Sequence, residues 1–201
     1  MVKSKMNSVE RVATFLALAI PLLAVPAARS SASPLQRLRA KTRVDAVTGV
    51  APAQLAGLYS STSKELRRRV APLSGDDLYL FPEGTYIHCE WTDIQPATVY
   101  DKGTWVFTNG QVALTFDQEI TWTPRVEREY VAVHRGSRTG EVLLVGTGTD
   151  LDYFEKHAGK DPEFMLLLSA KKLERTFSQQ EAEKLKTTLM KDAWRPKYFE
   201  H

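Results

Sequence analysis

The 201-residue chain has a single cysteine, Cys89, so it cannot form an internal disulfide. It also has no Cys/His cluster of the kind that builds a structural zinc site. Stability must therefore come from a hydrophobic core, and a composition of 43% hydrophobic and 25% charged residues is typical of a globular domain that can bury one. Cys89 itself is expected to serve as a small buried hydrophobe.

Signatures of catalysis are missing as well. The sequence has no Gly-x-Ser-x-Gly motif, which excludes the nucleophile elbow of many hydrolases. Gly146 and Gly148 lie between an expected strand and an expected helix, but a phosphate-binding loop needs a third glycine and a lysine. Asp150, Asp152 and Glu155 do not follow the spacing of a calcium loop. The sequence therefore predicts no cofactor.

The N-terminal segment has the layout of a targeting signal. Basic residues among the first eleven precede an almost uncharged stretch over 12–28, which is rich in Ala and Leu and is followed by small residues. This layout predicts a cleavable signal peptide over 1–32, hence a periplasmic or secreted protein with no transmembrane segment in its mature form. Pro21 and Pro26 interrupt the apolar stretch, which disfavours the alternative of an uncleaved anchor.

Net charge depends on this cleavage. The chain has 27 Lys and Arg against 24 Asp and Glu, and residues 1–32 hold four of the former and one of the latter, so the mature form would be neutral. Residues 33–53 carry Arg37, Arg39, Lys41 and Arg43 between small or apolar residues, which is typical of a basic flexible arm. Basic and aromatic residues are not interleaved as base stacking requires, so no nucleic acid partner is expected.

From residue 54 to the C-terminus the pattern predicts a β-rich domain. Alternating or apolar runs separated by turn residues predict strands at 54–60, 77–81, 85–94, 103–107, 112–116, 130–135, 142–147 and 164–169. Asn109-Gly110 is typical of a two-residue hairpin turn. Over 85–94 the alternation places Ile87, Cys89 and Trp91 on a core face and His88 on a polar face.

Two helices accompany the strands. One is predicted from Thr149 to Gly159. Ser178 and Glu181 form a capping box, and apolar residues follow it at helical spacing, which predicts an amphipathic C-terminal helix that ends near Pro196 and packs on the strands. Seven or eight short antiparallel strands with this helix predict a mainly β fold, either a barrel or a sandwich. A barrel is favoured because closure removes exposed edges.

Several segments resemble a known family. They are Leu55-Ala-Gly57-Leu-Tyr59, Leu78-Tyr-Leu-Phe-Pro-Glu-Gly84-Thr-Tyr86, Lys102-Gly-Thr-Trp105 and the Asn-Gly hairpin. Their spacing over about residues 55–116 resembles lipocalin-like small β-barrel proteins of the bacterial envelope. The resemblance implies a closed barrel that holds a ligand. True lipocalins have Gly-x-Trp on the first strand, where this chain has Gly57-Leu58-Tyr59.

Aromatic residues are concentrated on the β segment and provide the first candidate site. The residues are Tyr86, Trp91, Trp105, Phe107, Trp122 and Tyr130. They either line a barrel interior that takes a small apolar ligand or fill that interior as core. The leading hypothesis is an exported, non-catalytic β-barrel protein that binds a small apolar ligand or an envelope protein. A structural envelope protein is a further alternative.

The competing hypothesis is a secreted hydrolase or metal-binding protein. His88 and Glu90 share a strand face and His134 lies on another strand, and two histidines with a carboxylate suffice for a metal site or for acid–base chemistry. Asp93 and Tyr86 would assist in catalysis. The alternation predicts instead that this face meets water. The basic run 67–69 is expected in an early loop or strand as a solvated surface, with attraction to an acidic ligand or lipid as the alternative.

Overall fold

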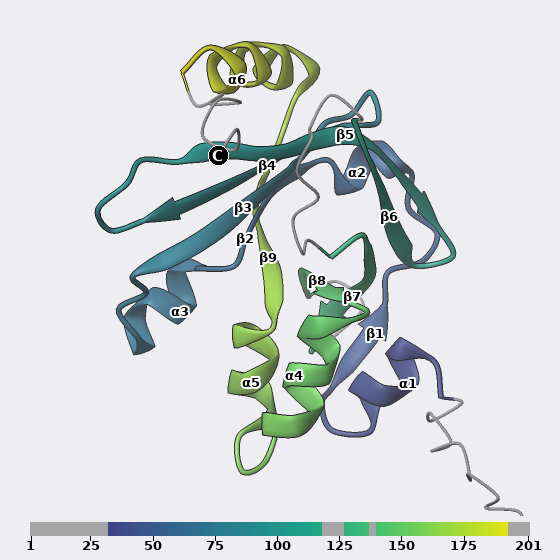
Figure 1. The fold of residues 1–201 in the computed structure, drawn as a ribbon. Coiled ribbons are helices and arrows are strands. Elements are labelled where there is room, and N and C mark those ends of the chain that lie inside the picture. The colour runs from purple at the N-terminus through teal and green to yellow at the C-terminus, as the bar shows by residue number, and fades with distance from the viewer. Residues whose placement is uncertain (1–31, 118–126, 137–139, 193–201) are drawn as a thin grey trace, which may run out of the picture. The chain divides into compact units, whose positions relative to one another are not determined.

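The computed structural model describes residues 32–117, 127–136 and 140–192, which belong to one compact unit (Figure 1). The predicted signal peptide, Trp122 and Pro196 lie outside the described residues. The strands are β1 Val44–Ala46, β2 Gly57–Ser60, β3 Ser74–Leu80, β4 Thr85–Thr92, β5 Thr98–Thr108, β6 Gln111–Phe116, β7 Glu129–Arg135, β8 Glu141–Gly146 and β9 Ala170–Thr176. The helices are α1 Pro34–Arg39, α2 Pro52–Leu55, α3 Lys64–Arg69, α4 Thr149–His157, α5 Pro162–Leu168 and α6 Gln179–Asp192.

Eight of the strands close into an antiparallel barrel. Their order is β7-β6-β5-β4-β3-β2-β9-β8, and β8 pairs again with β7. β1 is an additional strand. It pairs with β7 along the same edge as β6 but farther toward the end of β7: Ala113 of β6 pairs with Glu129, whereas Ala46 of β1 pairs with Val133. The predicted mainly β fold is therefore confirmed, and closure decides for the barrel over the sandwich.

Local signals explain several of the elements. Asn109 and Gly110 both have positive φ values, 53° and 81°, as the tight hairpin between β5 and β6 requires. The Ser178 hydroxyl accepts a hydrogen bond from the Glu181 backbone N–H, and the Glu181 carboxylate accepts from the Ser178 backbone. The predicted hairpin and the predicted capping box of α6 are thus confirmed.

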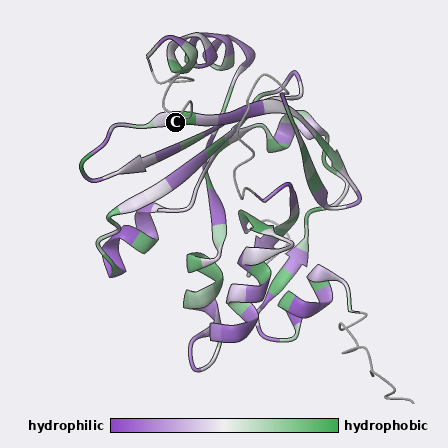
Figure 2. Ribbon diagram, viewed as in Figure 1, coloured by the Kyte–Doolittle hydropathy of each residue, from purple (hydrophilic) through white to green (hydrophobic). Residues whose placement is uncertain are grey.

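Much of the barrel wall is buried on both faces. Inside lies an apolar cluster that includes Tyr59, Tyr86 and Trp105. Outside, a second cluster lies under α1, α4 and α5, and a third lies under α6. Apolar and polar segments alternate along α6 (Figure 2), and its apolar residues belong to the third cluster together with Ile87 and the buried Cys89. Burial raises the pKa of the Cys89 thiol to about 12, which keeps it protonated.

The prediction of a flexible arm over 33–53 is wrong. Ser33 caps α1, Leu38 is fully buried in the second cluster, and β1 joins the sheet. Two of the basic residues of this segment, which suggested a solvated tether, form ion pairs: Arg37 with Asp152 and Glu155 of α4, and Arg39 with Asp45 of β1. The segment is therefore part of the barrel domain.

Two further expectations are corrected. Residues 164–169 were predicted as a strand, but α5 covers most of them because Asp161 accepts from the Phe164 N–H and Pro162 occupies the first turn. The strand is β9, the next segment. Its Lys and Arg residues lack the apolar pattern from which a strand is predicted. The basic run 67–69 is neither loop nor strand: it ends helix α3, whose N-cap is Ser63.

Candidate functional site

The predicted aromatic site is mostly core. Tyr86, Trp105 and Tyr130 are buried in the interior cluster, and Phe107 packs against it. The Trp105 indole N–H donates to the backbone carbonyl of Phe81 at 2.9 Å, so its polar edge is satisfied within the protein. These four rings occupy the space that an apolar ligand would need.

Further along the same strands the interior becomes polar. Leu78 faces inward on β3, so Asp76 two residues earlier faces inward as well. Tyr86 faces inward on β4, and so do His88 and Glu90. A cavity of about 260 Å³ results, which gives room for a small molecule. This acidic cavity is lined by Asp76, His88, Glu90, Glu127, Tyr130, Thr149, Asp150 and Lys171.

The polar face of β4 meets water only in part. His88 is only 3% exposed, because β4 lies in a closed barrel and its outer face is covered by α6 there, whereas Glu90 on the same face is exposed. A strand position with both faces covered has no solvent side, so alternation alone assigns the wrong environment to His88. Sequence reasoning found His88, Glu90 and Tyr130, and it considered Asp150 only as part of a calcium loop. It missed Asp76, Glu127 and Lys171, which lie on other elements.

Asp76 is the charged centre of the cavity wall. His88 Nε2 lies 2.8 Å from Asp76 Oδ2, and the Lys171 ammonium contacts the same oxygen. Burial acts to raise the pKa of Asp76, but the hydrogen bond from His88 and the charge of Lys171 outweigh it and hold the pKa well below its usual range. Asp76 is therefore ionised, and an ionised carboxylate can only accept hydrogen bonds. The Nε2 of His88 therefore carries a proton and donates to Asp76.

The contact with Asp76 places the other ring nitrogen, Nδ1, on the far side of the imidazole. A neutral imidazole that donates through Nε2 offers Nδ1 as an acceptor. Within the described residues, Nδ1 is buried and has no hydrogen-bond partner. The Tyr100 ring stands edge-on to the imidazole with centroids 5.8 Å apart. A buried polar atom without a partner is costly, so this nitrogen lowers the stability of the cavity wall.

The Gly146–Gly148 turn, which the sequence compared with a phosphate-binding loop, binds a carboxylate of the same chain, that of Glu127. The N–H groups of Gly148 and Asp150 each donate to the Glu127 carboxylate at 3.2 Å, at the N-terminus of α4. A Cβ at Gly146 would lie 2.5 Å from Glu127 Cγ, so the glycine makes room for this side chain. Glu127 therefore accepts the backbone hydrogen bonds that a phosphate would accept in a phosphate-binding loop.

Three carboxylates of the cavity form no ion pair with any described residue. Glu127 accepts from two backbone N–H groups, and the other two are Glu90 and Asp150. Burial raises the pKa of Asp150 to about 6, the charges of Glu127 and Asp76 add to that effect, and Lys171 opposes it. Partial burial also raises the pKa of Glu90. Both groups therefore gain from a cation or a strong hydrogen-bond donor placed between them.

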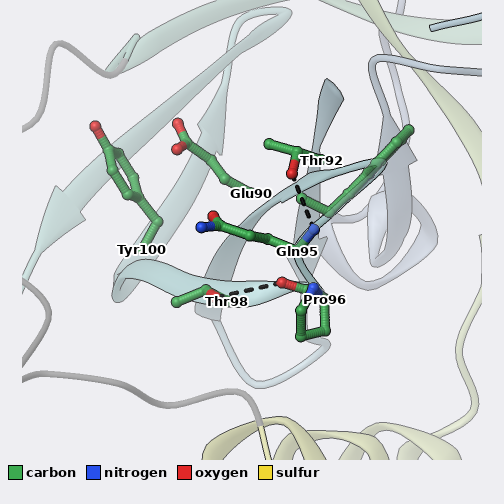
Figure 3. A pocket seen from close by; sticks show the side chains of 7 residues that line it. Glu90, Thr92, Gln95, Pro96, Thr98 and Tyr100 are labelled. Carbon is green, nitrogen blue, oxygen red and sulfur yellow. Dashed lines mark hydrogen bonds between the residues drawn. The ribbon is translucent and has the colours of Figure 1, made fainter. Parts of the chain in front are cut away.

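Glu90 also borders a second cavity of about 200 Å³ at the β4–β5 turn. Figure 3 shows Glu90 and Tyr100 on neighbouring strands, and the turn held by a hydrogen bond from the Gln95 N–H to the Thr92 hydroxyl at 3.0 Å. Trp91, another of the predicted aromatic residues, lines this second cavity and not the barrel interior. Asp93 lies in the exposed turn.

Tyr86 belongs to a structural network that the sequence did not suggest. Its hydroxyl donates to Asp101 Oδ2 at 2.8 Å, and the Arg128 guanidinium contacts both groups and lies 4.8 Å from the centre of the Phe116 ring. Burial raises the pKa of Tyr86, and the Asp101 charge raises it further. Tyr86 therefore cross-links the wall and is not free to act as a catalytic acid.

The structure does not bring His134 to His88 and Glu90. His134 Nδ1 lies 3.1 Å from the backbone carbonyl of Gly140, and its neighbours across the strands are Asp45 and Val142. In the part of the chain that the structure describes, no group of three or more His, Cys, Asp or Glu residues is placed to hold a metal ion. The predicted three-residue metal cluster does not assemble.

No family model, curated protein or solved structure matches the chain. None of the helices in 32–117, 127–136 and 140–192 has the length and apolar character needed to cross a bilayer. A proposal for function therefore rests on the geometry of the acidic cavity.

Proposed function

We propose that this chain is a non-catalytic binding protein of the lipocalin-like kind, and that its barrel holds a small polar ligand in the acidic cavity. The observation that carries the proposal is the division of the interior: aromatic rings fill one part, and charged residues from β3, β4, β9 and α4 surround a cavity in the other. An apolar ligand, the first expectation, would have to displace Trp105 and Tyr130.

The charges indicate which ligand fits. Asp76 is balanced by Lys171 and His88, and Glu127 by backbone N–H groups, which leaves Glu90 and Asp150 for the ligand. Charge-assisted hydrogen bonds to carboxylates are about twice as strong as neutral ones. A small protonated amine placed between Glu90 and Asp150 satisfies both groups. The proposed ligand class is thus a small amine.

A nuclear magnetic resonance titration of the full chain with putrescine, a small diamine, tests this proposal. Citrate serves as an anionic comparison, and an apolar fluorescent dye tests the original expectation. We expect saturable shifts confined to the cavity residues with putrescine alone. Glu90→Gln and Asp150→Asn should each weaken binding about tenfold or more, because each removes a charged hydrogen-bond acceptor.

Glu183→Gln is the matched control, because it removes the charge of an exposed carboxylate on α6. It should leave putrescine binding unchanged. Absence of saturable binding, or an equal loss in the control, would refute the amine proposal. Saturable binding of the dye in its place would restore the apolar ligand.

An acid–base enzyme is the second candidate, favoured by one observation. His88 on the Asp76 carboxylate and Asp150, with a pKa of about 6, share one cavity. Incubation with small esters and amides, followed by proton spectra, tests it. Turnover that His88→Gln abolishes would support an enzyme, whereas no turnover together with putrescine binding supports the binding protein.

Export is part of the proposed function, and its support is the basic and apolar layout of residues 1–32. N-terminal sequencing of the protein recovered from its own cells tests this part separately. A mature chain that begins between residues 28 and 33 is the expected result. A chain that retains residues 1–32 in the cytoplasm would refute export without affecting the binding site.

A further inference from the structure

Exposed apolar side chains gather at one end of the barrel wall. Val70 and Leu73 precede β3, Ile94 lies in the β4–β5 turn, and their exposed fractions are 37%, 69% and 84%. A hydrogen bond of 2.8 Å from the Asp93 N–H to the Leu73 carbonyl joins the two segments. These three residues, here called the apolar tip, are three of the five most exposed large apolar residues in the described chain. Clustering of this kind is uncommon on a surface without a partner.

Basic residues border the apolar tip. Helix α3 ends at Arg69, and Val70 is its C-cap, so the helix and the tip are continuous. Lys64, Arg67 and Arg68 are exposed, and Lys64 and Arg68 form no ion pair with any described residue. Figure 1 shows α3 and the β4–β5 turn on the same side of the barrel.

The acidic residues near the apolar tip do not cancel this charge. Glu65 of α3 is engaged by Arg135 of β7, with 2.6 Å between Oε2 and Nη2. Arg69 contacts Glu65 at 3.8 Å and lies over the Phe164 ring, so it points toward α5. Asp93 is the exposed carboxylate in the turn. Positive charge therefore prevails beside the tip.

We propose that the apolar tip, together with the basic residues of α3, docks on the surface of an anionic lipid bilayer. Exposed apolar side chains enter the boundary between headgroups and acyl chains, and neighbouring Lys and Arg residues contact anionic headgroups. Trp91, half-buried beside the turn, suits the same depth, because tryptophan favours the membrane interface. This docking is independent of the ligand in the acidic cavity.

Hydrogen exchange of the full chain with vesicles tests the docking locally. Vesicles of phosphatidylglycerol and phosphatidylcholine are compared with vesicles of phosphatidylcholine alone. We expect slower exchange at residues 70–73 and 93–97 with the anionic vesicles only, and its reversal in high salt. The readout is confined to the tip, so binding through residues 1–31 does not imitate it.

Two variants and one control sharpen the test. Leu73→Ser with Ile94→Ser, and Arg67→Ser with Arg68→Ser, should each lower protection at the tip at least fivefold. Val106→Ser changes an apolar residue of β5 that is 59% exposed, away from the tip, and should have no effect. All changes are on the surface, and circular dichroism should show unchanged folding. Exchange at the tip that does not respond to anionic vesicles would overturn the proposal. Protection that depends on protein concentration without lipid would assign the tip to a second copy of the chain instead.

Discussion

The interior of the barrel has two regions built from the same strands. In one, Tyr59, Trp105 and Tyr130 pack against aliphatic residues. In the other, Asp76 and Lys171 surround a cavity. The strand residues of both regions face inward at period two, and the polar region adds Glu127 and Asp150 from outside the strands. The comparison indicates that the apolar region stabilises the barrel, whereas the polar region holds the ionisable groups on which the proposed binding depends.

The largest expected effect tests the apolar region. Trp105→Ala leaves a large cavity and removes the indole hydrogen bond to the Phe81 carbonyl, so we expect a loss of about 3–5 kcal/mol in the free energy of unfolding. Urea unfolding measures it. The control is Val106→Ala, the next residue on the opposite, exposed face, with a change below about 0.5 kcal/mol. Comparable losses in both variants would mean that the interior cluster does not carry the stability.

A smaller effect is expected at the charged centre of the polar region. Asp76→Asn leaves Lys171 without its counter-charge. The free energy of unfolding should fall by about 2 kcal/mol, a moderate loss because the Asp76 side chain is only partly buried. Wild-type stability from this residue is complete above the ordinary aspartate pKa and is lost as the pH falls below about 4, since the folded-state pKa is depressed. Urea unfolding at pH 7 and pH 3 measures both. A difference between the two proteins that persists unchanged at pH 3 would contradict this role.

The third expected effect has the opposite sign. The folded-state pKa of Asp150 is about 6, above its unfolded value, so ionisation opposes folding. The stability of the wild type relative to Asp150→Asn should fall as the pH rises from about 4 to about 6, and at pH 7 the variant should be more stable by about 1–2 kcal/mol. Unfolding curves at pH 4.5, 5.5 and 7 measure this difference. Parallel pH profiles would show that ionisation of Asp150 does not oppose folding, and they would weaken its assignment to the ligand site.

Local signals in the sequence predicted the elements that depend on neighbouring residues. Asn109-Gly110 predicted its hairpin because its positive φ values are a local requirement, and Ser178 with Glu181 predicted the start of α6 because a capping box spans one turn. Elements that depend on distant partners were missed. β9 carries Lys171 and Lys172, which find carboxylates on other strands, so its composition did not look like that of a strand.

The sequence by itself determined the β-rich character, the turns, the amphipathic helix and three residues of the cavity wall, His88, Glu90 and Tyr130. Only the tertiary structure decided which environment they share. Closure of β8 onto β7 and the packing of helices outside the wall buried His88 on one face of β4 and Cys89 on the other, which alternation cannot foresee. The same closure brought Asp76, Glu127 and Asp150 beside His88 from separate elements, because long-range pairing, and not spacing along the chain, sets which side chains meet.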